Sequence, residues 1–202
     1  MRDLAAVALV LAACAGTASA EENVLACEGP FAADSSQARL VAAFGKANVA
    51  FEEVDGPEGS KEMATVVFGK DPKRRLTIRW DDEAKRQRPL HIELGPAWRL
   101  ANGLRRDLSL AEVEALNGRP FALSGFEWDY GGYVTDWKKG RLERLPGGCN
   151  AIVGFGPDEA APSAALDKVS GDATFASDSK AMRAVKPRVG IIALGYPAKP
   201  GI

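Results

Sequence analysis

The run GFEWDYGGYVTDWKKGRLERLPGGC, residues 125–149, decides most of what the sequence says about the fold. It holds two of the four Trp residues, Trp128 and Trp137, and two of the three Tyr residues. Before Gly131 and Gly132, aromatic and acidic residues alternate with the period of two that is typical of a half-buried strand. A Gly-Gly pair favours a two-residue turn, because such turns need positive φ at their centre. The run therefore predicts a β-hairpin that turns on these two glycines.

A two-residue turn fixes which side chains share a face of this hairpin. One face should carry aromatic rings and a threonine, namely Phe126, Trp128, Tyr130, Tyr133, Thr135 and Trp137. These rings are either core packed under helices or an exposed surface with typical binding residues. The other face should carry Glu127, Asp129, Val134 and Asp136, with Glu127 opposite Asp136. Like charges across a sheet are unfavourable, so this face predicts a cation site, a surface for a basic partner, or an ordinary solvated face.

Residues 1–20 have the pattern of an export signal. Arg2 precedes an apolar run over residues 4–15 that is too short to span a bilayer. Ala18-Ser19-Ala20 is a suitable cleavage motif, so we expect the mature chain to begin at Glu21 and to be periplasmic or secreted. The alternative is a lipobox at Leu11-Ala12-Ala13-Cys14, which would make the protein an outer-membrane lipoprotein anchored at Cys14.

Composition limits the function classes. The formal net charge of −1 provides no excess of positive charge for binding nucleic acid. No later apolar stretch is long enough for a transmembrane helix. Removing residues 1–20 leaves about 180 residues, enough for one domain or two small ones.

Two cysteines remain beyond the signal, Cys27 and Cys149. An even pair without a CxxC motif in an exported chain predicts one disulfide bond. It would join the start of the mature chain to the end of the aromatic run. The alternative is two unpaired thiols.

Two segments resemble each other, residues 36–46 and residues 109–119. Each begins with a serine that suits a helix N-cap and ends on a glycine that suits the position after a helix. Ser109 is followed by Glu112 at the spacing of a capping box. The pattern predicts an internal repeat of helix-plus-sheet units, residues 21–100 and 101–202; the alternative is chance similarity of two short Ala-rich helices.

Strand-like runs follow each predicted helix. They cover residues 48–54, 64–68, 76–80 and 90–94, and then residues 121–130, 133–137, 141–145 and 150–155. Short helices are predicted over residues 163–169 and 179–185, and a last strand over residues 188–196. The predicted fold class is α+β, with two tandem helix-plus-antiparallel-sheet units.

A helix ending in Val113-x-x-Leu116-x-Gly118-Arg119-Pro120, then a strand with Trp128-x-Tyr130, resembles the β-lactamase-inhibitor-protein-like repeat. The same repeat occurs in small outer-membrane assembly lipoproteins. The longer run with Trp-Asp-Tyr-Gly-Gly resembles uncharacterised secreted proteins of proteobacteria. The resemblance implies tandem repeats that bind another protein. The sequence departs from the inhibitor pattern in its cysteines, which would bridge across the chain, and in its first repeat, which lacks Trp-x-Tyr.

The sequence offers no set of catalytic residues. The single histidine, His91, excludes a His-rich zinc site, and phosphate-binding and nucleophile-elbow motifs are absent. We therefore expect no cofactor, no metal and no enzyme activity. The predicted function is binding of another envelope protein, as an inhibitor or an assembly or scaffold factor, with a small-ligand or glycan-binding module as the alternative. The candidate binding residues are Trp128, Tyr130, Tyr133, Trp137, Glu127 and Asp129.

Overall fold

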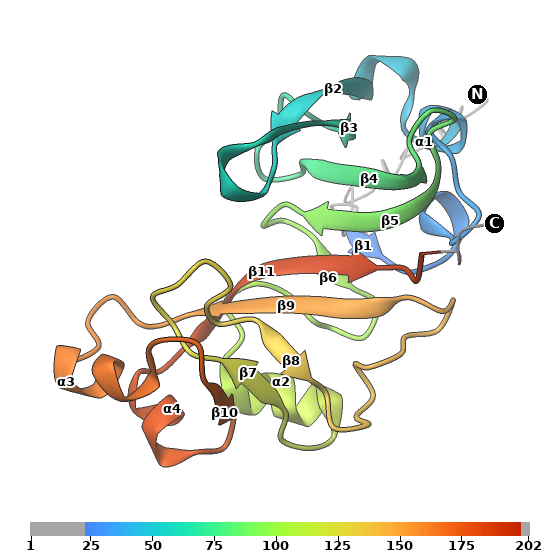
Figure 1. Cartoon of the computed structure of the whole chain (residues 1–202). Helices are drawn as coiled ribbons and strands as arrows, with labels where there is room; N and C mark the ends of the chain where they lie inside the picture. The colour runs from blue at the N-terminus through green and yellow to red at the C-terminus, as the bar shows by residue number, and fades with distance from the viewer. Residues whose placement is uncertain (1–22, 199–202) are drawn as a thin grey trace, which may run out of the picture.

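A computed structural model of the chain describes residues 23–198. The predicted export signal, cleavage motif and lipobox lie outside the described residues. The main sheet has six antiparallel strands in the order β2-β3-β4-β5-β11-β9 (Figure 1). These strands are β2 (Val49–Asp55), β3 (Lys61–Val67), β4 (Leu76–Asp82), β5 (Gln87–Leu94), β11 (Arg188–Gly195) and β9 (Asn150–Gly156).

A smaller antiparallel sheet has the order β10-β7-β8 and lies below β9 in Figure 1. Its strands are β10 (Thr174–Ala176), β7 (Ala122–Ser124) and β8 (Val134–Asp136). The short strands β1 (Val24–Leu25) and β6 (Arg99–Leu100) form a parallel pair. The α-helices are α1 (Gln37–Phe44), α2 (Leu110–Asn117), α3 (Ser163–Leu166) and α4 (Lys180–Ala184), and four 3-10 turns complete the elements, η1 (Gly29–Phe31), η2 (Lys46–Asn48), η3 (Pro57–Gly59) and η4 (Asp167–Val169).

Local sequence signals set the ends of α1 and α2. The Ser36 hydroxyl accepts a hydrogen bond from the Arg39 amide, and Ser109 forms the full capping box with Glu112. Gly118 ends α2 with φ +84°, in the left-handed region that favours glycine. The predicted helix starts and ends are therefore confirmed, because caps are decided by a few neighbouring residues.

The α+β class is confirmed, and strands outnumber helices. The main sheet is continuous across the predicted junction, because β11 pairs with β5 through Leu194 and Ile92. One large hydrophobic cluster includes Leu40 of α1, Val113 of α2 and strand residues from both halves. The tandem arrangement of units 21–100 and 101–202 stays a prediction. Among residues 23–198, no helix is long and apolar enough to cross a membrane.

The predicted two-residue hairpin is wrong in its register. β7 and β8 pair as neighbours, but Ala122 lies opposite Asp136 and Leu123 opposite Val134. Residues 125–133 form a loop between them instead of two strands meeting at the glycines. The amide of Phe126 donates to the Val169 carbonyl at 2.8 Å, so this segment is paired with residues 169–173 rather than with β8.

The predicted strand at residues 141–145 is also absent; this segment is a series of turns. The buried side chain of Asn117, at the end of α2, explains the turn. Its Nδ2 donates to the carbonyls of Arg119 and Trp137, each at 3.0 Å, and its Oδ1 accepts from the Leu142 amide at 3.2 Å. A Cβ at Gly140 would lie only 2.0 Å from that Oδ1, so the chain passes too close for any other residue.

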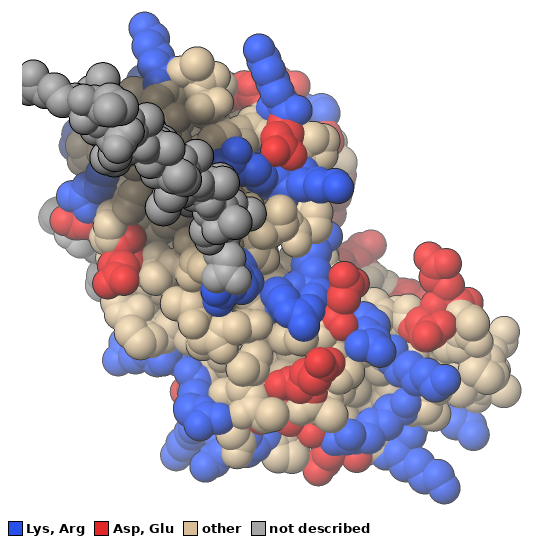
Figure 2. Space-filling model, turned by 180° about the vertical axis from the view of Figure 1, so that it is seen from behind, with Lys and Arg blue, Asp and Glu red and all other residues tan. Residues whose placement is uncertain are grey.

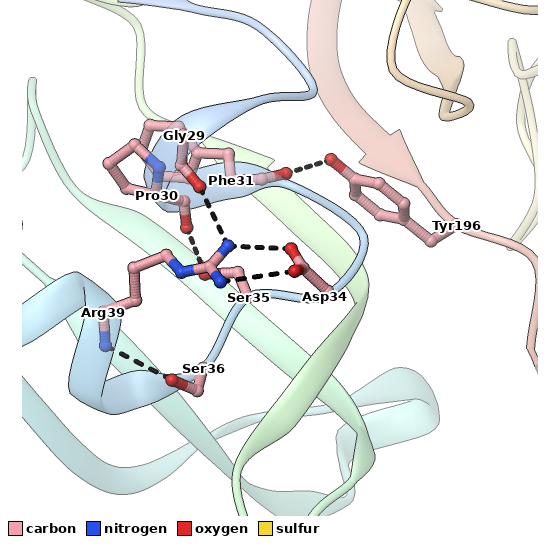
Figure 3. A network of polar contacts seen from close by, with 8 residues as sticks. All are labelled: Gly29, Pro30, Phe31, Asp34, Ser35, Ser36, Arg39 and Tyr196. Carbon is pink, nitrogen blue, oxygen red and sulfur yellow. Dashed lines mark hydrogen bonds and ion pairs between the residues drawn. The ribbon is translucent and has the colours of Figure 1, made fainter.

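The beginning and the end of the described chain are held together. Cys27 and Cys149 form the predicted disulfide bond, with Cα atoms 6.0 Å apart. Near it, the Tyr196 hydroxyl donates to the Phe31 carbonyl (Figure 3). Arg39 forms a bidentate ion pair with Asp34 in the same network. Burial raises the pKa of Tyr196 above its usual range, so this hydroxyl keeps its proton as a donor.

Candidate functional site

The loop at residues 125–133 is held in one shape by backbone and side-chain hydrogen bonds. The Ser124 hydroxyl donates to the Tyr130 carbonyl at 2.6 Å and accepts from the Tyr133 amide at 3.1 Å. The Gly132 amide closes the base of the loop on the Gly125 carbonyl at 3.0 Å. The sequence thus builds a compact loop from one serine and three glycines.

Gly132 is required where this loop meets the main sheet. Its φ is +76°, and a Cβ there would lie 2.0 Å from the Phe155 carbonyl oxygen. The same approach lets the Phe155 amide donate to the Gly132 carbonyl at 2.9 Å, and Tyr133 bridges Gly154 next to it. The loop is therefore anchored to β9 of the main sheet as well as to β7 and β8.

This anchoring divides the aromatic residues into two groups. Phe126 and Trp137 are core residues, and the Trp137 indole donates to the Ala151 carbonyl at 3.1 Å. Trp128, Tyr130 and Tyr133 instead reach the surface, and Tyr130 is 55% exposed. The prediction of a single aromatic face is wrong, because the loop breaks the alternation on which it rested.

The three surface rings line a groove of about 710 Å³. Its other wall comes from η3, the turn between β2 and β3, and its end from the segment that leads into β10. Ser124, Thr135 and Thr174 add hydroxyl groups. Pockets of roughly 300–1,000 Å³ are the usual size for bound small molecules, and an open groove of this kind also fits one segment of a polypeptide.

The aromatic side chains in the groove have fixed orientations. The Trp128 indole nitrogen donates to the Gly125 carbonyl at 3.0 Å. The Trp128 and Tyr130 rings meet edge to face, with centroids 5.6 Å apart and planes at 69°. Tyr133 is half-buried, and this burial, with a smaller effect of the nearby Glu93 carboxylate, raises the pKa of its phenol. The Tyr133 hydroxyl therefore stays protonated at neutral pH and can donate a hydrogen bond.

Three carboxylates line the same groove, those of Glu58, Asp129 and Asp172, and no lysine or arginine lines it. Within residues 23–198, these three side chains take part in none of the observed hydrogen bonds or ion pairs. Elsewhere many acids are matched by bases, for example Glu114 by Arg183 at 2.6 Å. Figure 2 shows basic and acidic side chains interspersed on the face turned away from the viewer of Figure 1.

The predicted acidic face does not form. Glu127 has φ +62° in the loop, and its carboxylate accepts from the Ser170 hydroxyl at 2.7 Å. Asp136 pairs with Lys138, whose hydrogen bonds lower the pKa of the Asp136 carboxyl. Glu127 and Asp136 are thus not opposite each other, and of the predicted acidic residues only Asp129 lines the groove.

His91 lies in a polar network on the main sheet. Its Nδ1 is 3.5 Å from an Arg79 nitrogen, and Arg79 is paired with Glu62 and lies 3.8 Å from Glu93. Burial lowers the pKa of His91, and the charge of Arg79 lowers it further. The imidazole is therefore neutral at pH 7. In the described part of the chain, no three His, Cys, Asp or Glu side chains group as a metal site.

Sequence reasoning missed Glu58 and Asp172, which face the aromatic loop from distant parts of the chain. The Pro57-Glu58-Gly59 turn is recognisable as a turn, but nothing in it indicates which loop it approaches. No family model, no curated protein and no solved structure matches this chain. The inhibitor-like resemblance therefore stays an expectation from the motifs quoted above.

Proposed function

We propose that this chain is an exported, non-catalytic binding protein of the bacterial envelope that engages another protein through the aromatic groove. The observation that carries the proposal is the trio Trp128, Tyr130 and Tyr133, displayed on a rigid loop. Trp and Tyr contribute most to protein interfaces when they are pre-ordered, because little side-chain entropy is then lost on binding. The disulfide bond fits an oxidising compartment such as the periplasm or the extracellular medium.

A small ligand or glycan is the second candidate. The groove volume of about 710 Å³ lies within the range for small-molecule sites. Its rings could stack on a sugar, and its hydroxyls and carboxylates could bond to the hydroxyl groups of that sugar. This candidate uses the same groove but needs no protein partner.

Affinity capture tests the first proposal. Tagged, oxidised protein is incubated with native periplasmic and envelope extract, beside the Tyr130→Ala variant and a Leu90→Ala control. Leu90 is 39% exposed and does not line the groove. We expect one protein at a constant ratio with wild type and the control, and at least about a tenfold loss with Tyr130→Ala, as for a strong interface residue. Equal capture by all three proteins would contradict the proposed site. If no protein is captured and the wild-type protein binds a glycan on an array, the second candidate would be favoured.

A further inference from the structure

The groove combines fixed aromatic rings with uncompensated negative charge. Trp128 presents an indole whose orientation is set by its bond to Gly125, and Tyr130 packs against it edge to face. Around these rings stand Glu58, Asp129 and Asp172, with no basic side chain in the lining. Neutral ligands would leave these charges without a counterpart, whereas a cation would complement them.

We propose that the groove receives a basic segment of the partner polypeptide, with an arginine or lysine side chain placed between the Trp128 ring and the Asp129 and Asp172 carboxylates. This inference rests on the proposed function and specifies the chemistry of its partner. A cation is attracted to an aromatic face, and most strongly to that of Trp. A guanidinium group can also donate to carboxylates while it stacks on a ring.

The groove has two features that suit a side chain rather than a free metal ion. Its carboxylates are spread over three separate segments, η3, the aromatic loop and the turn before β10, and they do not form a metal-binding group. Its walls are also mostly apolar, which suits the aliphatic stem of a lysine or arginine side chain. A long side chain can place apolar carbons on the rings and its charge at the acidic rim.

The test uses fluorescein-labelled hexaarginine and, as a neutral match of the same shape, hexacitrulline. Binding is followed by anisotropy at about 0.15 M ionic strength, where charges outside the groove are largely screened, and by the indole N–H signals in ¹H–¹⁵N NMR spectra. The four tryptophans give four such signals, and Trp128→Phe assigns that of Trp128. We expect hexaarginine to shift the Trp128 signal, while the buried indoles of Trp80 and Trp137 keep their positions, because these donate to Thr65 and Ala151 inside the fold.

Charge removal inside the groove should weaken this binding. Asp129→Asn/Asp172→Asn keeps the shape and should raise the Kd for hexaarginine by about five- to tenfold, since exposed ion pairs are individually weak. Glu53→Gln/Glu83→Gln changes the net charge equally, at exposed positions outside the groove, and should leave the Kd within about twofold once salt screens distant charges.

Equal affinity for hexacitrulline, or an unchanged Kd in Asp129→Asn/Asp172→Asn, would overturn the inference. Those results would leave the proposed function intact if partner capture still depended on Tyr130. If capture were independent of Tyr130, the proposed function itself would fail, whatever hexaarginine did. The two failures are therefore distinguishable.

Discussion

Replacing Trp137 with alanine should destabilise the protein far more than replacing Tyr130. Trp137 is only 7% exposed, and its ring lies 5.1 Å from that of Phe121. Its indole also satisfies the Ala151 carbonyl in β9. Removing a buried indole costs about 3–5 kcal/mol, which includes the cavity left behind. Tyr130, by contrast, is 55% exposed, and the loss of its edge-to-face contact with Trp128 should cost about 1 kcal/mol or less.

Urea unfolding followed by circular dichroism measures this difference. Trp137→Phe is the comparison variant, because it keeps one six-membered aromatic ring but removes the N–H donor and the rest of the fused ring. The lost hydrogen bond should cost about 1–2 kcal/mol, to which the loss of packing adds. The assay should rank the variants as Trp137→Ala, then Trp137→Phe, then Tyr130→Ala, from least to most stable. A similar loss for Trp137→Ala and Tyr130→Ala would refute the division of the aromatic residues between core and groove.

Three further predictions concern the scaffold. Cys27→Ser/Cys149→Ser should lower the free energy of unfolding by about 5 kcal/mol, a value that follows from the chain-entropy relation for a sequence separation of 122. A loss below about 1 kcal/mol in urea unfolding would show that the disulfide bond does not constrain the unfolded chain. Asn117→Ala should cost about 2–4 kcal/mol, because it removes three hydrogen bonds and leaves the buried Leu142 amide without its acceptor. Asn48→Ala removes one exposed hydrogen bond and should cost about 0.5 kcal/mol. Equal costs would count against the role of Asn117. The pKa of His91 should lie below its ordinary value of 6.5, as measured from its single imidazole Cε1–H NMR signal. The unfolded state then binds more protons than the folded state, so the free energy of unfolding should fall as the pH drops below 6.5. His91→Gln should remove that part of the pH dependence.

The sequence predicts those parts of the fold that depend on near neighbours. Ser36 and Ser109 begin helices because each caps an amide three residues later, and both helices end at a glycine. The disulfide follows from the number of cysteines and the expected compartment. The helix caps depend on a few neighbouring residues, and the disulfide prediction depends only on the number of cysteines and the compartment.

The aromatic loop could not be predicted in the same way. The Gly131-Gly132 pair favours a tight hairpin locally. In the structure, however, residues 125–126 form backbone hydrogen bonds with residues 169–173, which are far away in the sequence. The Ser124 hydroxyl then completes the loop that replaces the hairpin. Alternation of apolar and polar residues carries no information about such distant pairing partners, so the register that it predicts for the hairpin is wrong.

The candidate site shows the same limit. The alternating pattern of residues 125–137 predicts Trp128, Tyr130, Tyr133 and Asp129 as binding residues, and all four line the groove. The same pattern also predicts Trp137 and Glu127, but Trp137 lies in the core and the Glu127 carboxylate accepts a hydrogen bond from Ser170. The opposite wall, at Glu58, depends on how the β2–β3 turn approaches the loop, which only the tertiary structure defines.

Site-specific photo-crosslinking tests most directly whether the groove is the binding surface for another protein. A benzophenone amino acid is placed at position 130 or at position 90 of the full chain in its native cells, and adducts are identified by mass spectrometry after illumination. Binding of another protein in the groove predicts one dominant protein adduct from position 130 and none of that mass from position 90. Adducts of equal yield from both positions, or a dominant adduct from position 90 alone, would contradict it.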